Sequence, residues 1–111
     1  YIPDMAALNQ INQKGTIINY QIRIVMGTWC SDSRREVPRF FKIMDGLNFP
    51  LDSMIIINVD TGKQAKNTFA AEMDIKRIPT FVFYRNGFEK GRIVESPEVS
   101  LEKDLIKIIS E

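Results

Sequence analysis

The fold is decided by one stretch, IINYQIRIVMGTWCSDSRREVPRFFKIMDGL, which runs from residue 17 to residue 47. Its first part, Ile17–Met26, is rich in isoleucine and valine, which predicts a strand buried between layers and ending at Gly27. From Cys30 onward the apolar residues recur every three or four positions, which predicts a long helix that Pro38 bends without ending it. The core stripe of this helix comprises Val37, Phe40, Phe41, Met44 and Leu47.

Shorter elements lie on both sides of this stretch. The segment Pro3–Lys14 carries Met5, Leu8 and Ile11 at helical spacing, which predicts a short amphipathic helix with these residues on its core face. After the long helix, Met54–Val59 is an apolar, β-branched run of strand length. The chain therefore alternates helices and strands.

The second half continues this alternation and then changes. A capping-box pattern predicts a helix over residues 61–73. Phe81–Tyr84 has the composition of a strand, and Asn86-Gly87 is a tight-turn signal that pairs it antiparallel with Arg92–Val94. The sheet is therefore expected to be mixed.

A last helix completes the order of elements. Ser96 followed by Pro97 predicts its start, and its core stripe comprises Leu101, Leu105 and Ile108. This order predicts an α/β fold, a three-layer sandwich with a mixed sheet, a C-terminal antiparallel hairpin and helices on both faces.

Composition limits the chemistry. The chain has 111 residues, a formal net charge of +1, one cysteine and no histidine. This length predicts a single domain, residues 1–111, with its own hydrophobic core. The single cysteine excludes intramolecular disulfides and zinc sites built from several thiolates, and the absence of histidine excludes imidazole catalysis. We expect a soluble domain without metal or other cofactor, cytoplasmic or exported depending on any segment upstream of Tyr1. The near-neutral charge and the short apolar runs argue against nucleic-acid and membrane partners.

Cys30 is the candidate reactive group. It lies where a strand ends and a helix begins, and the amides and dipole of a helix start favour the thiolate, which is the nucleophile in disulfide exchange. Arg34 and Arg35 favour the same negative charge and Asp32 opposes it. The sequence leaves open which of these side chains points toward the sulfur. The alternative is that Cys30 is a small, buried and unreactive apolar residue.

Several short motifs of the chain occur together in one known family. As a set they resemble the thioredoxin superfamily, over nearly the whole chain from Ile17 onward. These motifs are Gly27–Ser33 after a strand, Pro38 inside the next helix, Asn58–Asp60, Ile78-Pro79-Thr80 before a strand, and the turn Arg85–Gly87.

The resemblance implies a site. Cys30 would be the nucleophilic thiol and Trp29 the aromatic residue that flanks it. Pro79 would be a cis proline opposite the thiol, although a proline considered alone favours the trans bond. The backbone at Ile78 would pair with an extended substrate peptide.

The chain departs from the family pattern at three positions. Ser33 stands where the usual Cys-x-x-Cys pair has its second thiol, so Cys30 cannot be resolved within the chain. The resemblance then implies a monothiol mechanism, in which a mixed disulfide at Cys30 is released by an external thiol such as glutathione. Ser33 would donate a hydrogen bond to the thiolate. The buried carboxylate of the family and its partnering lysine fall on Ile24 and Ile56.

Three interpretations follow from these departures. The expected one is monothiol thiol-disulfide exchange on protein or low-molecular-weight disulfides. The second is a non-catalytic peptide-binding or chaperone module that uses the same groove. The third is that Ser33 is an engineered replacement of a cysteine, against which the two isoleucines argue, because one substitution would not explain them.

Overall fold

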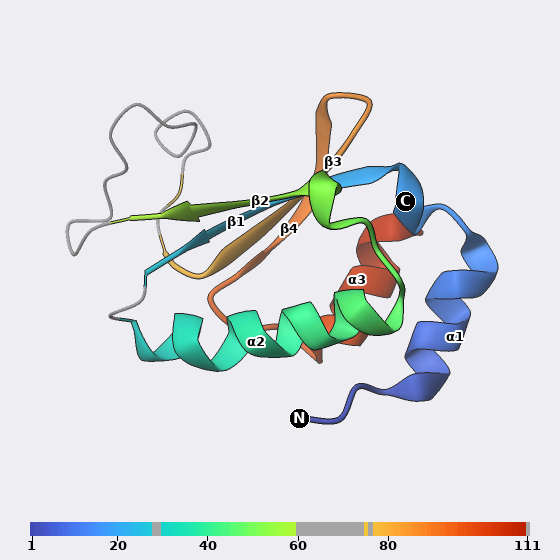
Figure 1. Cartoon of the computed structure of the whole chain (residues 1–111), viewed down its shortest axis with the longest axis horizontal. Helices are drawn as coiled ribbons and strands as arrows, with labels where there is room; N and C mark the ends of the chain where they lie inside the picture. The colour runs from blue at the N-terminus through green and yellow to red at the C-terminus, as the bar shows by residue number, and fades with distance from the viewer. Residues whose placement is uncertain (28–29, 60–74, 76, 111) are drawn as a thin grey trace.

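The computed structural model describes residues 1–27, 30–59, 75 and 77–110, and the helix expected over residues 61–73 lies outside them. Figure 1 shows a sheet with helices packed against it. The helices are α1 (Met5–Lys14), α2 (Ser31–Gly46) and α3 (Leu101–Ile109), with short 3₁₀ turns η1 (Ile17–Asn19) and η2 (Leu51–Ser53). The strands are β1 (Tyr20–Met26), β2 (Met54–Asn58), β3 (Thr80–Arg85) and β4 (Phe88–Val94).

The sheet is mixed, with the strand order β2-β1-β3-β4. The first two strands are parallel, and β3 is antiparallel to both β1 and β4. Asn86 and Gly87 have φ values of 54° and 82°, which are the left-handed values of the predicted two-residue hairpin turn. The partner strand begins at Phe88 rather than at Arg92, and its register shifts at Lys90, between the pairs that Phe83 and Tyr84 make.

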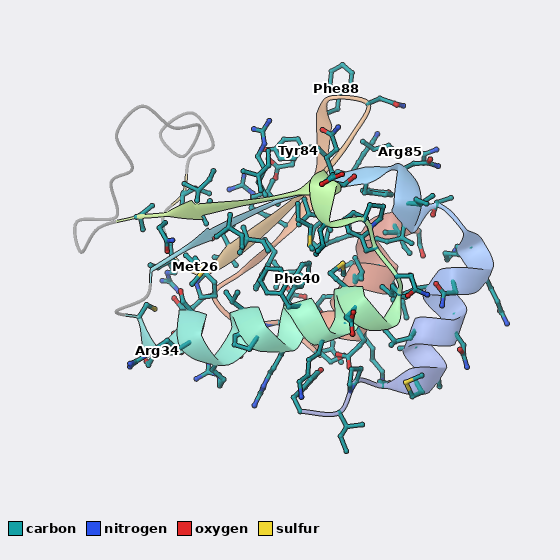
Figure 2. The ribbon with its side chains drawn as sticks, viewed as in Figure 1. Met26, Arg34, Phe40, Tyr84, Arg85 and Phe88 are labelled. Atoms are coloured by element: carbon teal, nitrogen blue, oxygen red, sulfur yellow. The ribbon has the colours of Figure 1, made fainter. Side chains whose placement is uncertain are left out.

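The main core lies between one face of the sheet and the three described helices. Ile22 and Ile24 of β1 and Phe81 and Phe83 of β3 point into it, because alternate residues of a strand face the same side. Figure 2 shows Phe40 between α2 and the sheet, where its ring stacks on Phe81 with 4.5 Å between the centroids. The predicted stripe of α2 therefore packs on the predicted strands.

A smaller apolar cluster lies on the opposite face of the sheet. Cys30 and Ile75 pack against it while remaining partly exposed. Cys30 thus lies at the margin of this second cluster, which consists of Val25, Ile57, Val59, Ile78 and Val82.

The N-terminal elements differ from the expectation in two details. Met5 is 59% exposed, and Ala7 takes the predicted core position instead. The Asp4 side chain caps the helix by accepting a hydrogen bond from the Ala7 amide, which makes Met5 the first helical residue. Ile17–Asn19 form a 3₁₀ turn, and the strand begins only at Tyr20.

The last helix begins later than Ser96-Pro97 predicted. Its N-cap is Ser100, whose hydroxyl accepts a hydrogen bond from the Lys103 amide at 3.0 Å. The segment before it is turned by Asp104, whose carboxylate accepts from the amides of Glu98 at 2.8 Å and Val99 at 3.2 Å. These bonds satisfy backbone donors that a longer helix would have placed in its first turn.

Candidate functional site

Cys30 occupies the N-cap position of α2 with an extended backbone, at φ −90° and ψ 123°. Its amide donates to the Gly27 carbonyl at 3.1 Å, and its carbonyl accepts from the Arg34 amide at 3.0 Å. These bonds place a free, half-buried thiol between the end of β1 and the first turn of the helix. This is the predicted location, where helix amides and the helix dipole favour an anion.

The thiol lies beside a segment far away in the sequence. Its Sγ is 3.7 Å from the carbonyl oxygen of Ile78, the geometry of a weak S–H···O bond across 48 positions. The Ile78–Pro79 peptide bond is cis. Both residues are buried, just before β3 begins at Thr80. The sulfur and the loop before β3 therefore lie side by side. The resemblance placed Pro79 of this loop opposite the thiol, and the contact of Ile78 with substrate stays a prediction.

Ser33 is fully buried one turn into the site. Its Oγ accepts a hydrogen bond from the Gly27 amide at 3.2 Å. The hydroxyl therefore ties α2 to the end of β1. Its proposed donation to the Cys30 thiolate stays a prediction.

The two arginines in the first two turns of α2 differ in their contacts. Arg35 donates from Nη2 to Asp32 and from Nε to Glu36, both at 2.8 Å. The hydrogen bond to Glu36, followed by the one to Asp32, raises the pKa of the Arg35 guanidinium above its ordinary value. Arg34 is exposed at the N-terminal end of α2, as Figure 2 shows. The sequence could not distinguish these two arginines.

The positions of the family's carboxylate and lysine are apolar and adjacent. Ile24 pairs with Ile56 in the parallel register of β1 and β2. Ile24 is fully buried in the main core, whereas Ile56 is 46% exposed. No proton can be relayed through either side chain.

One neighbour of the site was missed by the sequence reasoning. Glu95 has a left-handed φ of 66°, and its amide donates to the Pro79 carbonyl at 2.6 Å. Its carboxylate lies 4.0 Å from the guanidinium of Arg77. The hairpin register could have indicated this contact, because Thr80 pairs with Val94 in an antiparallel ladder, so that Pro79, one residue earlier, lies opposite Glu95, one residue later. Trp29, the predicted flanking aromatic residue, lies outside the described residues.

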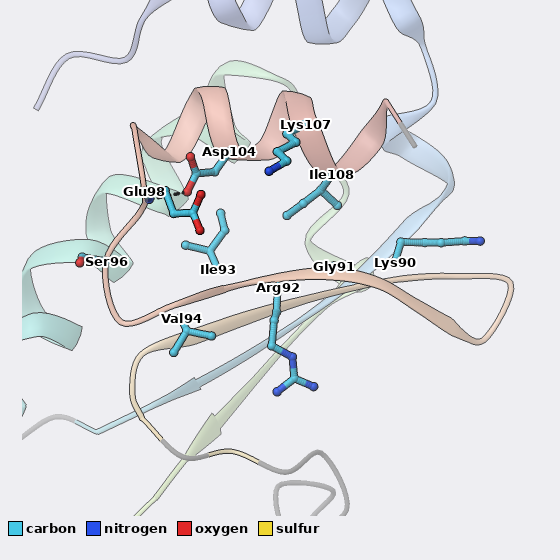
Figure 3. A pocket seen from close by; sticks show the side chains of 10 residues that line it. All are labelled: Lys90, Gly91, Arg92, Ile93, Val94, Ser96, Glu98, Asp104, Lys107 and Ile108. Atoms are coloured by element: carbon cyan, nitrogen blue, oxygen red, sulfur yellow. Dashed lines mark hydrogen bonds between the residues drawn. The ribbon is translucent and has the colours of Figure 1, made fainter.

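A hollow of about 270 Å³ lies elsewhere, between β4 and α3. Figure 3 shows Ile108 and Lys107 directed from α3 toward β4, and the side chain of Arg92 directed from β4 away from α3. None of the residues that line this hollow belongs to the site around Cys30.

Two searches of the described residues gave negative results. They contain no group of three or more His, Cys, Asp or Glu side chains that could hold a metal ion. None of their helices has the length and apolar character required to span a membrane.

Comparison with solved structures agrees with this architecture. The thioredoxin of Malassezia sympodialis superimposes with a TM-score of 0.56 at 28% sequence identity, covering 92% of this chain and 85% of that one. The thioredoxin of Fasciola hepatica gives a TM-score of 0.55 over 96% of this chain and 91% of its own, at 20% identity, a level that speaks for the fold alone.

Sequence comparison identifies the family. A thioredoxin-like protein of Acanthamoeba polyphaga mimivirus, R548, is 31% identical over 80 residues, which are 72% of this chain and 56% of that protein. An H-type thioredoxin of Populus jackii is 26% identical over 104 residues, which are 92% of this chain and 67% of that protein. The chain thus spans about 56% and 67% of these two relatives. The thioredoxin family model matches residues 6–111, and with the α/β sandwich and the Cys30–Ile78 site this shows that the chain belongs to the thioredoxin family.

Proposed function

We propose that this domain carries out thiol-disulfide exchange by a monothiol mechanism. The observation that carries the proposal is the Cys30 Sγ lying 3.7 Å from the Ile78 carbonyl, at the start of a helix. A disulfide held along the Ile78–Pro79 backbone would pass close to this sulfur. Membership of the thioredoxin family supports the redox chemistry.

The reaction has two balanced steps. The Cys30 thiolate attacks one sulfur of the substrate disulfide, so that bond breaks, a Cys30–substrate disulfide forms, and the other sulfur leaves as a thiolate that takes a proton from water. An external thiolate such as glutathione then attacks the mixed disulfide and returns the Cys30 thiolate. One disulfide is consumed and one is formed, so the exchange needs no further oxidant.

Each site residue has a role in this proposal. Cys30 is the nucleophile, and Ser33 donates a hydrogen bond to its thiolate. Trp29 flanks the substrate, and Ile78 and Pro79 contact it. The substrates are protein or low-molecular-weight disulfides, with glutathione as an external reductant.

The first prediction tests the nucleophile with a glutathionylated peptide as substrate and glutathione as reductant. The native chain should form a mixed disulfide, detected by mass, and release the peptide at a rate that rises with glutathione concentration. Cys30→Ser should abolish both signals because no thiolate remains. Ser31→Ala is the matched control, since Ser31 is exposed in the same turn.

Two outcomes separate the alternatives. Release at the uncatalysed rate, with no mixed disulfide, would contradict the exchange proposal. Peptide binding that persists in Cys30→Ser while exchange is absent from the native chain would instead indicate the peptide-binding module.

A further inference from the structure

Asp32 presents an electrostatic problem for a nucleophilic Cys30. It lies two residues after the cysteine, in the first turn of α2. A carboxylate there stabilises the helix start, but it repels a thiolate at the N-cap. A reactive Cys30 therefore requires the Asp32 charge to be compensated or kept at a distance.

The structure places a cation on this carboxylate. Asp32 Oδ1 is 2.8 Å from Arg35 Nη2, three residues further along the helix. Arg35 lies further along α2 than Asp32, so the contact joins the carboxylate to a group on the side away from the N-cap residue. An isolated exposed pair of this kind would order its side chains only weakly.

A second contact fixes the cation. Arg35 Nε is 2.8 Å from Glu36 Oε2, and the side chain of Glu36 is only 4% exposed. The buried carboxylate anchors one edge of the guanidinium, which leaves its Nη2 group directed at Asp32. The planar fork of arginine suits such two-point binding, and a lysine could not reproduce it.

We infer that Arg35 is a positioning residue for the chemistry at Cys30: held by Glu36, it keeps the Asp32 carboxylate away from the sulfur. This inference rests on the proposed function, in which Cys30 is the nucleophile. Arg35 acts through Asp32 and does not touch the substrate. Arg34, although closer in sequence, forms no ion pair with a described residue, whereas Arg35 forms two.

The test is a cycle of variants read by alkylation of Cys30 with iodoacetamide, a neutral probe. In R35Q the rate at pH 7 should fall about threefold, a size typical of one unit charge acting on the thiolate through water, and the pH profile should move to higher pH. D32N should restore the native rate in the R35Q background. In the native background D32N should change the rate little, because Arg35 already keeps the Asp32 carboxylate away from the sulfur. Among the described residues, the charged side chains of Arg34, Arg77 and Glu95 are unchanged throughout.

R39Q is the matched control, because it removes the same charge one turn further along α2, where Arg39 lies 4.0 Å from Glu36. It should leave the alkylation rate unchanged. A native rate in R35Q, an equal loss in R39Q, or an equal acceleration by D32N in both backgrounds would overturn the inference. If R35Q fails to fold, R35K takes its place in the cycle, and its expected loss of alkylation rate is smaller. A native alkylation rate in R35K that D32N does not change would also overturn the inference.

Alkylation also separates this inference from the proposed function. A native chain that exchanges no disulfide, but whose alkylation rates follow the cycle, would defeat the proposed function and leave the role of Arg35 intact. Exchange that depends on Cys30, without the cycle, would defeat the role of Arg35 alone.

Discussion

At the scale of single residues, the site has a half-buried thiol three residues before a buried hydroxyl. Cys30 is half-buried at the N-cap, and Ser33 is fully buried with its oxygen on the Gly27 amide. Two side chains that are three residues apart at the start of a helix, as Cys30 and Ser33 are, lie on the same side of it. A thiol in place of the hydroxyl would therefore lie within reach of Cys30.

The second prediction is that Ser33→Cys converts the monothiol site into a dithiol site. Under mild oxidation the variant should lose both free thiols and stay monomeric, because an intramolecular disulfide forms. Its reduction of a disulfide substrate should then no longer require an external thiol to resolve the mixed disulfide. Thiol counting and mass measurement check the first part, and a single turnover of the reduced variant without added thiol, in which both substrate thiols should be released, checks the second.

Ser31→Cys is the control for this variant, because an adjacent cysteine is poorly placed to bridge Cys30. Two free thiols persisting in Ser33→Cys under conditions that oxidise small dithiols would contradict the prediction. Oxidation without a gain in turnover would point to Ile24 and Ile56, which carry no proton, as the limiting positions.

The residue scale also shows where sequence reasoning about the site ends. The helix-start location of Cys30 follows from the change of apolar period after Gly27. Only the resemblance, which placed Pro79 opposite the thiol, brought the loop before β3 to Cys30, because no local pattern joins segments 48 positions apart. The choice between Arg34 and Arg35 needed coordinates, since it depends on the burial of Glu36. Glutamate is a residue type that is usually exposed, so the sequence predicts the opposite.

At the scale of elements, local signals succeeded where one motif allowed one conformation. Asn86-Gly87 predicted its hairpin because both residues adopt positive φ readily. The predicted start of α3, at Ser96, was wrong because Ser96 and Ser100 both fit an N-cap position. The carboxylate of Asp104, which reaches back to the amides of Glu98 and Val99, decides between them.

The packing of α3 on β4 depends on a glycine. Gly91 faces Ile108 across this contact, as Figure 3 shows. A Cβ at position 91 would lie 2.9 Å from Cγ1 and 3.2 Å from Cγ2 of Ile108, closer than carbon atoms approach without a shift. The glycine therefore lets the helix lie close to the edge strand.

The third prediction follows: Gly91→Ala should lower the free energy of unfolding by about 1–3 kcal/mol through overpacking, measured by urea denaturation. Ile108→Ala should be less destabilising in the Gly91→Ala background than in the native chain, because it removes the atoms that clash. Strictly additive effects of the two substitutions would show that the helix shifts freely and would contradict this account.

At the scale of the whole molecule, the first residues of the chain join two helices that are distant in sequence. The Tyr1 hydroxyl and the Asp4 amide donate to the two oxygens of Glu102 in α3, each at 2.7 Å. The ring of Tyr1 also lies 5.1 Å from the guanidinium carbon of Arg39 in α2. No sequence pattern predicted this contact, because Glu102 is only 2% exposed and reads as an ordinary first-turn acid of a surface helix.

The last prediction uses the acidity of Tyr1. Burial, and then the hydrogen bond to Glu102, raise the pKa of the Tyr1 hydroxyl well above its ordinary value of 10.0. The unfolded chain therefore releases this proton at lower pH than the folded chain does, so the contribution of Tyr1 to stability is complete below pH 10 and declines as the pH rises above it. In Tyr1→Phe the unfolding free energy should be lower by about 1 kcal/mol at pH 7, because Glu102 loses a donor. Its decline above pH 10 should be shallower than in the native chain. Urea denaturation across this range measures both quantities, and parallel curves for the two proteins would show that Tyr1 ionises alike in the folded and unfolded states.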